Sequence, residues 1–328
     1  MDTLRHQSNE HNSSFLVINE TNRVGNISQF VGYKTYILFP LINGFGLTNT
    51  IAVFGVFSNS LNIIVYLKLG LRETTNISFL ALGISDWLFC VCSFLSVTCH
   101  LSEISPYGAA MTNLDTEISV VTLPCLGLGA WVIVLLSAER CLCIVMPLKV
   151  KTIVTRRRIV CLISGMVVYQ AVFGVLILIF VRSPEKSSKT RLYLILSSVS
   201  IPVFVCFILV LCFTTFMVIR LRKSLEWRNT TSTQSTKTSG AKERKVVLSV
   251  LWICVMFIVC FTPFVACFIT SIVYPRFNLW DPYYGWFVQV MFTFNFVFQT
   301  ISSASNIFIY YFMSTKFREV FTGLLKCT

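Results

Sequence analysis

The residues of this chain best suited to chemistry are polar side chains set within long apolar runs. Asn59, Asp86 and Asn306 each stand near the middle of such a run. A charge inside a bilayer costs about 2.5–3.5 kcal/mol even on lenient insertion scales, so it needs a compensating partner. The pattern favours one buried network, in which Asp86 accepts hydrogen bonds from Asn59 and Asn306 and holds a cation. The alternative is three unrelated polar groups that only help helices to pack.

A second polar group lies where two apolar runs end. One run closes with Glu139 and Arg140, and a later run opens beside Glu243. Glu243 precedes Pro263 by twenty residues, about 30 Å of helix, which places it at the same depth as Arg140. A carboxylate and a guanidinium facing each other could form a bidentate latch between two helices. The alternative for Glu139 and Arg140, taken alone, is a solvated surface pair.

Long membrane helices would position these residues, and the composition supports such helices. Of the 328 residues, 55% are apolar and 12% are charged, and the mean hydropathy is +0.74. A soluble domain carries about 25% charged residues. The thirteen cysteines and three histidines show no metal-ligand spacing, and no constellation of an enzyme active site is visible. The chain is therefore predicted to be an all-α membrane protein without catalytic activity.

Seven apolar segments reach the roughly 20 residues that cross hydrocarbon. They are expected at 38–67, 77–99, 117–146, 157–181, 192–222, 244–273 and 284–313. Residues 1–37 would form an outer tail, residues 38–313 a seven-helix transmembrane bundle, and residues 314–328 a short amphipathic eighth helix and tail.

The distribution of basic residues predicts the orientation. With seven spans, 19 of the 27 Lys and Arg residues fall on one side of the membrane, which should be the cytoplasmic side. The N-terminus would then be extracellular and the C-terminus cytoplasmic, at the plasma membrane. Asn12, Asn19 and Asn26 begin glycosylation triplets in the outer tail and agree with this orientation. The net charge of +13 thus reflects orientation, and no nucleic-acid partner is expected.

In this order and spacing, the residues resemble the rhodopsin-like (class A) G-protein-coupled receptors from Phe54 to Phe321. The similar motifs are Asn59 in Ser58-Asn59-Ser60-Leu61, Asp86 in Leu82-Gly83-Ile84-Ser85-Asp86, Glu139-Arg140-Cys141, Pro202, Phe261-Thr262-Pro263, Asn306-Ile307-Phe308-Ile309-Tyr310 and Phe317-Arg318-Glu319-Val320-Phe321. Phe261 replaces the family's usual Trp, and Ile307 replaces Pro. The run from Glu139 to Thr152 also looks like invertebrate chemosensory or neuropeptide-type receptors.

One departure from the family concerns the outer disulfide. Members usually join the third helix to the second outer loop through a cysteine pair. Asp115 stands at the third-helix position, and the loop from Arg182 to Arg191 has no cysteine. Both partners are absent together, which is typical of a divergent branch.

The resemblance implies a receptor that binds an extracellular ligand and activates a heterotrimeric G protein by outward movement of the sixth helix. Glu139, Arg140, Glu243 and Tyr310 would form the coupling end and its latch. Phe261 would act as a switch, Pro263 and Pro202 as hinge prolines, and Asp86 would bind a structural sodium ion.

Further expectations concern accessory partners and rival functions. The resemblance adds arrestin and a receptor kinase as partners, beside the lipid bilayer, and Cys327 as a palmitoylation candidate. The alternative function is a transporter or channel of another seven-helix family, although no internal repeat or pair of broken helices is visible.

Ligand contacts are expected in the outer half of the bundle. Family position suggests Thr122, Leu126 and Ser198. Phe264, Phe268 and Phe296 could line an apolar cavity. Thr122 stands where amine receptors carry Asp, which disfavours a monoamine and leaves a small molecule or short peptide. In a chain with 29 Phe residues, packing is an equal alternative for the phenylalanines.

Overall fold

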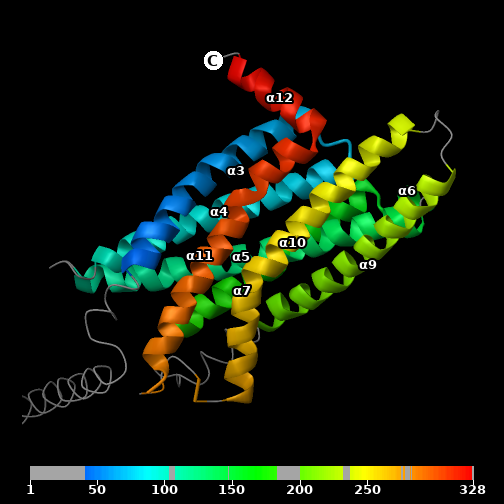
Figure 1. Cartoon of the computed structure of the whole chain (residues 1–328). Coiled ribbons are helices and arrows are strands. Elements are labelled where there is room, and N and C mark those ends of the chain that lie inside the picture. The colour runs from blue at the N-terminus through cyan, green and yellow to red at the C-terminus, as the bar shows by residue number, and fades with distance from the viewer. Residues whose placement is uncertain are drawn as a thin grey trace, which may run out of the picture.

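The computed structural model describes residues 41–102, 108–146, 148–182, 200–231, 237–274, 276–277, 281 and 283–326. Within these ranges the chain forms helices and no strands (Figure 1). In chain order the elements are η1 (Leu41–Thr48), α3 (Asn49–Leu69), α4 (Thr74–Ser102), α5 (Gly108–Val145), α6 (Val150–Ile153), α7 (Arg156–Arg182), α9 (Ile201–Thr231), α10 (Lys237–Val273), α11 (Gly285–Met313) and α12 (Thr315–Lys326).

Several helices extend beyond the apolar segments that predicted them. α5 begins at Gly108 although its apolar segment was expected from residue 117, and α10 begins at Lys237 although its segment was expected from residue 244. α9 continues to Thr231, past the expected end at residue 222. Hydropathy marks the part of a helix that suits lipid, whereas backbone hydrogen bonding can continue through polar residues in water. The apolar segments therefore locate the helices without giving their ends.

Within the described ranges, six helical stretches are long and apolar enough to cross a membrane on their own. They are Ile42–Leu69, Thr74–Cys99, Val121–Val145, Arg156–Ile179, Ile201–Lys223 and Lys245–Val273. α11 is 29 residues long and has no charged side chain, but Asn295, Gln299 and Asn306 lower its hydropathy. All three amides are buried. α11 thus keeps its polar face inside the bundle.

α5 lies at the centre of the bundle and α7 lies at its edge. Of the apolar stretch of α5, 56% is buried, compared with 11% for α7. α5 packs against α4, α7, α9 and α10. The exposed side chains of α7 include Val168, Val175 and Ile179, which suit contact with lipid tails. α5 is surrounded by other helices and α7 presents much of its surface to lipid, so each helix can be apolar on every face.

Close helix contacts fix the part of the bundle that carries the polar residues. Gly55 of α3 faces α4 and α11 so closely that an added Cβ would lie 2.5 Å from Cys90 Sγ and 3.3 Å from Ala304 Cβ. Small residues permit this approach of helices in membranes. The contact holds the next turn of α3, which carries Asn59, against α11.

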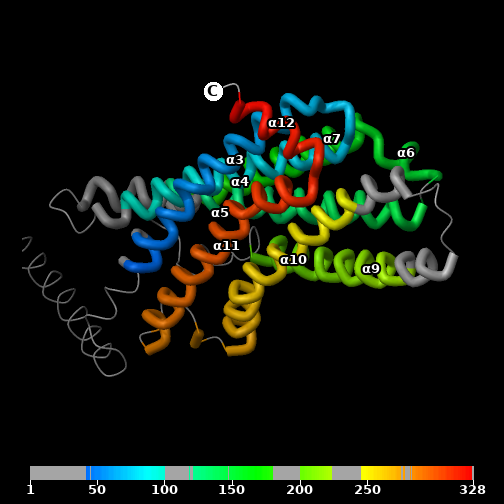
Figure 2. Tube along the Cα trace, turned by 45° about the horizontal axis from the view of Figure 1, so that its top comes forward, coloured from blue at the N-terminus to red at the C-terminus, as the bar shows by residue number. Residues whose placement is uncertain are grey.

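α12 turns away from α11 and packs against the end of α3, as both views show (Figures 1 and 2). Phe317 is fully buried, whereas Lys316 and Arg318 on the same helix are exposed. The backbone N–H of Phe317 donates to Ser314 Oγ at 3.2 Å, which stabilises the start of the helix. The predicted amphipathic eighth helix is thereby confirmed. We call this side of the molecule the α12 end.

Candidate functional site

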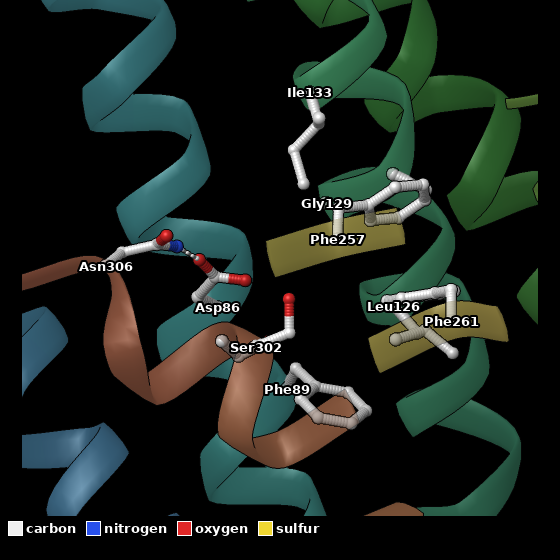
Figure 3. Close-up of a pocket in the computed structure, with 11 residues that line it drawn as sticks. Asp86, Phe89, Leu126, Gly129, Ile133, Phe257, Phe261, Ser302 and Asn306 are labelled. Carbon is white, nitrogen blue, oxygen red and sulfur yellow. Dashed lines mark hydrogen bonds between the residues drawn. The ribbon is translucent and has the colours of Figure 1, made fainter. Parts of the chain in front are cut away.

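Asp86 lies on α4, contacts α11 and borders a small cavity (Figure 3). Its side chain is 6% exposed, and its Oδ2 accepts a hydrogen bond of 2.7 Å from Asn306 Nδ2. Asn306 is also buried. A hydrogen bond to a charged group is worth about 1.5–3 kcal/mol, so this contact is a strong link between α4 and α11.

The cavity beside Asp86 has a volume of about 20 Å³, enough for one water molecule or one small ion. Its lining consists of Asp86, Phe89, Leu126, Gly129, Ala130, Ile133, Phe257, Phe261, Ser302, Ser303 and Asn306. No basic side chain of the described ranges forms an ion pair with Asp86. Hard cations bind carboxylate and hydroxyl oxygens, and both groups line this cavity. The residues present therefore fit a small cation such as sodium.

Asn59 does not reach Asp86. Its side chain is fully buried, and Nδ2 donates at 3.0 Å to both Gly55 O and Ser303 O. An amide nitrogen has two N–H groups, so both are used. The predicted hydrogen bond from Asn59 to Asp86 is therefore wrong. Asn59 instead ties α3 to the backbone of α11.

Phe261 of α10 borders the same cavity. Its side chain is 3% exposed and stacks on Phe257, with ring centroids 4.2 Å apart and planes at 29°. Pro263 follows two residues later inside α10 and removes one backbone hydrogen bond from the helix. The switch and hinge candidates of α10 thus lie next to the Asp86 cavity. Pro202, the other hinge candidate, is the second residue of α9 and does not line the Asp86 cavity.

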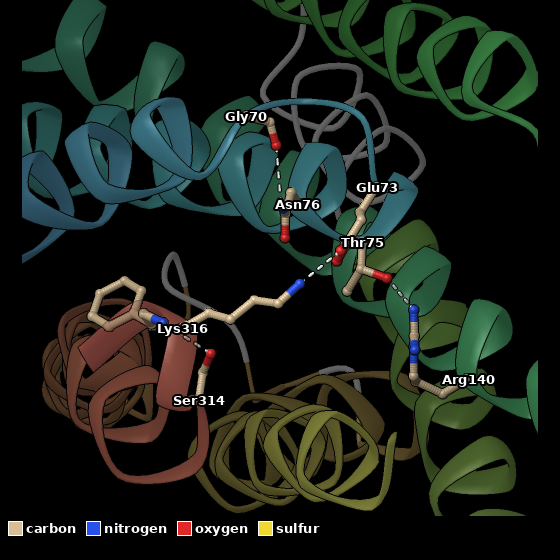
Figure 4. A network of polar contacts seen from close by, with 8 residues as sticks. Gly70, Glu73, Thr75, Asn76, Arg140, Ser314 and Lys316 are labelled. Carbon is tan, nitrogen blue, oxygen red and sulfur yellow. Dashed lines mark hydrogen bonds and ion pairs between the residues drawn. The ribbon is translucent and has the colours of Figure 1, made fainter. Parts of the chain in front are cut away.

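Arg140 and Glu139 lie near the end of α5 and are buried, with exposed fractions of 8% and 2%. Arg140 Nη2 donates a hydrogen bond to Thr75 Oγ1 of α4 (Figure 4). The same Nη2 lies 3.7 Å from Glu139 Oε2. Glu139 Oε1 accepts a hydrogen bond of 3.0 Å from Ser78 Oγ, also of α4. The alternative of a solvated surface pair is therefore wrong.

The buried pair retains unused hydrogen-bonding capacity. Arg140 Nε and Glu139 Oε2 have no hydrogen-bond partner. A guanidinium carries five N–H groups in a fixed planar arrangement, which suits carbonyl and carboxylate groups of another protein. Arg140 can therefore bind a partner if the helices around it separate.

A comparison with family models gives the family of the chain. The model described as 7 transmembrane receptor (rhodopsin family) matches residues 59–310, from Asn59 to Tyr310. The match covers more than half of the 328 residues. The chain belongs to the rhodopsin family of receptors. A search of curated proteins found no match. The family confirms the predicted seven-helix bundle and points to a receptor, in preference to an enzyme or a transporter.

Tyr310 of this receptor lies in an aromatic cluster, which we define as Tyr66, Phe79, Tyr310 and Phe317. The ring centroid of Tyr310 is 5.2 Å from that of Tyr66, 5.0 Å from Phe79 and 5.5 Å from Phe317. The cluster joins α3, α4, α11 and α12. The Tyr310 hydroxyl is buried without a hydrogen-bond partner. The structure therefore does not link Tyr310 to Arg140 by a hydrogen bond.

Of the predicted ligand contacts of the receptor, Leu126 borders the Asp86 cavity described above, and the other described residues lie outside its lining. Thr122 is buried, and its hydroxyl donates to Ile118 O of its own helix at 2.9 Å. Phe268 packs against Phe204 of α9, with centroids 5.7 Å apart. Phe264 and Phe296 are half-buried and pack against the main core. Packing accounts for these phenylalanines in this arrangement.

Several predicted residues lie outside the described part of the receptor. These are Asn12, Asn19, Asn26, Ser198 and Cys327. Glu243 lies on α10, but its side chain is not among those described. The same holds for the side chain of Asp115 on α5.

Sequence reasoning missed four hydroxyl residues of the receptor: Thr75, Ser78, Ser302 and Ser303. Residues three or four apart lie on the same helix face. That spacing puts Thr75 and Ser78 together, and it puts Ser302 and Ser303 on the face of Asn306. This spacing is visible in the sequence, but Ser and Thr are common in helices, so the spacing alone does not single out these four residues.

Proposed function

We propose that the receptor binds an extracellular ligand, a small molecule or a short peptide, and activates a heterotrimeric G protein. The observation that carries the proposal is Arg140, a buried guanidinium with an unused donor near the end of a central helix. A buried charge with few partners is costly, so its release to a charged or carbonyl-rich partner is favourable. Within a rhodopsin-family chain, a G protein is the partner that fits.

Activation would proceed by a shift between two helix arrangements. A ligand that binds the active arrangement more tightly shifts the population by no more than its differential affinity. α10 would swing outward at the end nearest Lys245, with the hinge near Pro263, where a backbone hydrogen bond is missing. Phe261, stacked on Phe257 beside the cavity, would transmit the change from α10 to α5 and α11.

Glu243 is proposed to latch α10 to Arg140 in the resting arrangement. The placement rests on the depth argument from the sequence, because α10 is continuous from Lys237 to Val273. Replacing Glu243 with Gln removes the charge and keeps the shape, and it should raise ligand-independent signalling. Unchanged basal signalling at equal surface expression would count against this latch.

The proposed location is the plasma membrane, with the N-terminus outside. The excess of basic residues on one side of the helices supports that orientation, as do the triplets at Asn12, Asn19 and Asn26. Cys327 would carry a lipid beside α12. Arrestin and a receptor kinase would act on the Ser- and Thr-rich segment at 230–239, where added phosphate changes the charge.

The test is a ligand screen on the full chain in cells, with small odorants, amino acids and short amidated peptides, recorded through several G proteins. Arg140→Gln should abolish the evoked signal and leave surface expression intact. Arg157→Gln, at an exposed arginine at the start of α7, is the matched control and should signal normally. Evoked signals of equal size in Arg140→Gln would refute the proposal.

A further inference from the structure

The start of α4 makes polar contacts with two other helices at the α12 end (Figure 4). Thr75 and Ser78 bind Arg140 and Glu139 of α5. Glu73, which directly precedes α4, forms an ion pair of 2.8 Å with Lys316 of α12. One short segment therefore touches both the coupling arginine and α12.

Local hydrogen bonds hold this segment in place. Asn76 Nδ2 donates to Gly70 O at 3.0 Å, across the turn between α3 and α4. Gly70 has a φ of +82°, a conformation that side chains of other residues rarely adopt. The Asn76 backbone N–H also donates to Glu73 O at 3.1 Å. A displacement of Glu73 would therefore be passed on to Thr75 as a movement of the whole turn.

We propose that the start of α4 is a clamp that holds Arg140 in the resting arrangement, and that α12 sets the position of the clamp through Lys316. In this inference, Thr75 and Ser78 are positioning residues that keep Arg140 and Glu139 turned toward α4. The inference rests on the proposed function, in which Arg140 must become free to bind a G protein. It adds a restraint from α4 to the one proposed from Glu243.

The two parts of the clamp differ in strength. The contacts of Thr75 and Ser78 are with charged groups that are at most 8% exposed, where a hydrogen bond is strong. The side chains of Glu73 and Lys316 are 60% and 63% exposed, so their ion pair is weak and sensitive to salt. Thr75 is therefore the main restraint on Arg140, and the Glu73–Lys316 pair adjusts it.

The central experiment measures basal G-protein activation by full-length variants at matched surface expression. Thr75→Val removes the hydroxyl with little change in volume and should raise basal activation by roughly tenfold, the factor for one charged hydrogen bond. Ser78→Ala should raise it less, because Glu139 keeps its contact with Arg140. Thr215→Val, the same change at an exposed threonine of α9 whose hydroxyl donates to Leu211 O of its own helix, is the matched control and should behave as the wild type.

The α12 part is tested by exchanging the charges. Glu73→Lys and Lys316→Glu should each raise basal activation severalfold, because like charges then face each other. The double exchange restores an ion pair and should return activation to the wild-type level. Two additive increases would show that Lys316 does not act through Glu73, and would overturn the role of α12.

Hydrogen–deuterium exchange of the same variants in nanodiscs separates the clamp from a merely structural contact. Faster exchange at the start of α4 in Thr75→Val, with basal activation unchanged, overturns the clamp. If the raised basal activation of Thr75→Val persists when Arg140→Gln is added to it, the role of Arg140 in the proposed function is refuted. If Arg140→Gln abolishes the raised basal activation of Thr75→Val, the result supports the clamp and the proposed function together.

Discussion

The two ends of the bundle are held together by contacts of different kinds. At the α12 end, a buried ion pair, two hydroxyl contacts to it and the aromatic cluster join α3, α4, α5, α11 and α12. At the opposite end, two hydrogen bonds between described helices are long. Asn43 reaches Thr293 at 3.4 Å, and Asn49 reaches Thr98 at the same distance.

The difference indicates which end is rigid and which can adapt. Buried charges and stacked rings lose much energy when their geometry changes, so the α12 end favours discrete arrangements. Long amide–hydroxyl contacts lose little, so the opposite end can adjust to a bound molecule at small cost. An adaptable end joined to a two-state end is the organisation that a ligand-driven switch requires.

The largest effect is expected for the aromatic cluster. Phe317→Ala removes a fully buried ring that anchors α12, and burial of this kind is worth about 3–5 kcal/mol. The purified receptor should show a clearly lower thermal midpoint. Phe312→Ala, at a ring that is 69% exposed, is the control and should change the midpoint little. If the thermal midpoint falls equally in the two variants, the aromatic cluster does not stabilise the α12 end more than an exposed ring does.

A pair of asparagines on α3 compares the centre of the bundle, at Asn59, with the end opposite α12, at Asn49. Asn59→Ala removes the side-chain hydrogen bonds to Gly55 O and Ser303 O and should destabilise the receptor by about 1–3 kcal/mol. Asn49→Ala should have a smaller effect, because Asn49 Oδ1 is already unsatisfied and its one contact is 3.4 Å long. Thermal midpoints of both variants in one detergent measure the difference. A larger loss for Asn49→Ala would show that the end opposite α12 is held more firmly than the centre of the bundle.

Much of the fold could be predicted from the sequence because lipid exposure leaves a strong compositional signal. The central segments of α4, α5 and α10 follow from apolar runs of sufficient length. The helix ends could not be predicted in the same way, because α5 and α10 continue into polar sequence where hydropathy carries no information. The tilt of α12 against α3 depends on Phe317, whose burial is a tertiary property.

The charged members of the candidate site and the hydrogen bond from Asn306 to Asp86 were predicted, but the other partners were missed. Asp86 and Arg140 are conspicuous because a charge within an apolar run is rare. The partner of a buried amide depends on side-chain rotation, which spacing does not determine. Asn59 accordingly binds Ser303 O and not Asp86. Thr75 and Ser78 are ordinary residues until the packing of α4 on α5 brings them to Arg140 and Glu139.

Sodium sensitivity is expected to be a smaller effect, and it tests the centre between the two ends. A bound ion stabilises the receptor by about 1 kcal/mol when its concentration is fourfold above the dissociation constant. Sodium chloride should therefore raise the thermal midpoint above that in N-methylglucamine chloride of equal ionic strength. Asp86→Asn should abolish this difference because it removes the charged ligand. The same sodium shift in Asp86→Asn would place the ion elsewhere or exclude it.

The smallest effect is expected at Asp281, at the end opposite α12. The backbone N–H of Tyr284, followed by that of Tyr283 and the Arg276 guanidinium, holds the pKa of Asp281 below its usual value. The two backbone contacts are 3.0 Å and 2.9 Å long and lead into α11. A carboxyl group with a lowered pKa contributes stability that is complete above the unfolded value of about 3.9 and is lost as the pH falls through the folded value.

Acidification should therefore remove a small part of the thermal stability below about pH 4. Asp281→Asn keeps an acceptor for the two N–H groups but has no proton to gain, so it should lose this pH dependence and little else. Because Arg276 is exposed, its ion pair with Asp281 adds little, and Arg276→Gln should follow the wild-type profile closely. A strong acid transition that disappears in Asp281→Asn would mean that this end is held by charge as firmly as the α12 end.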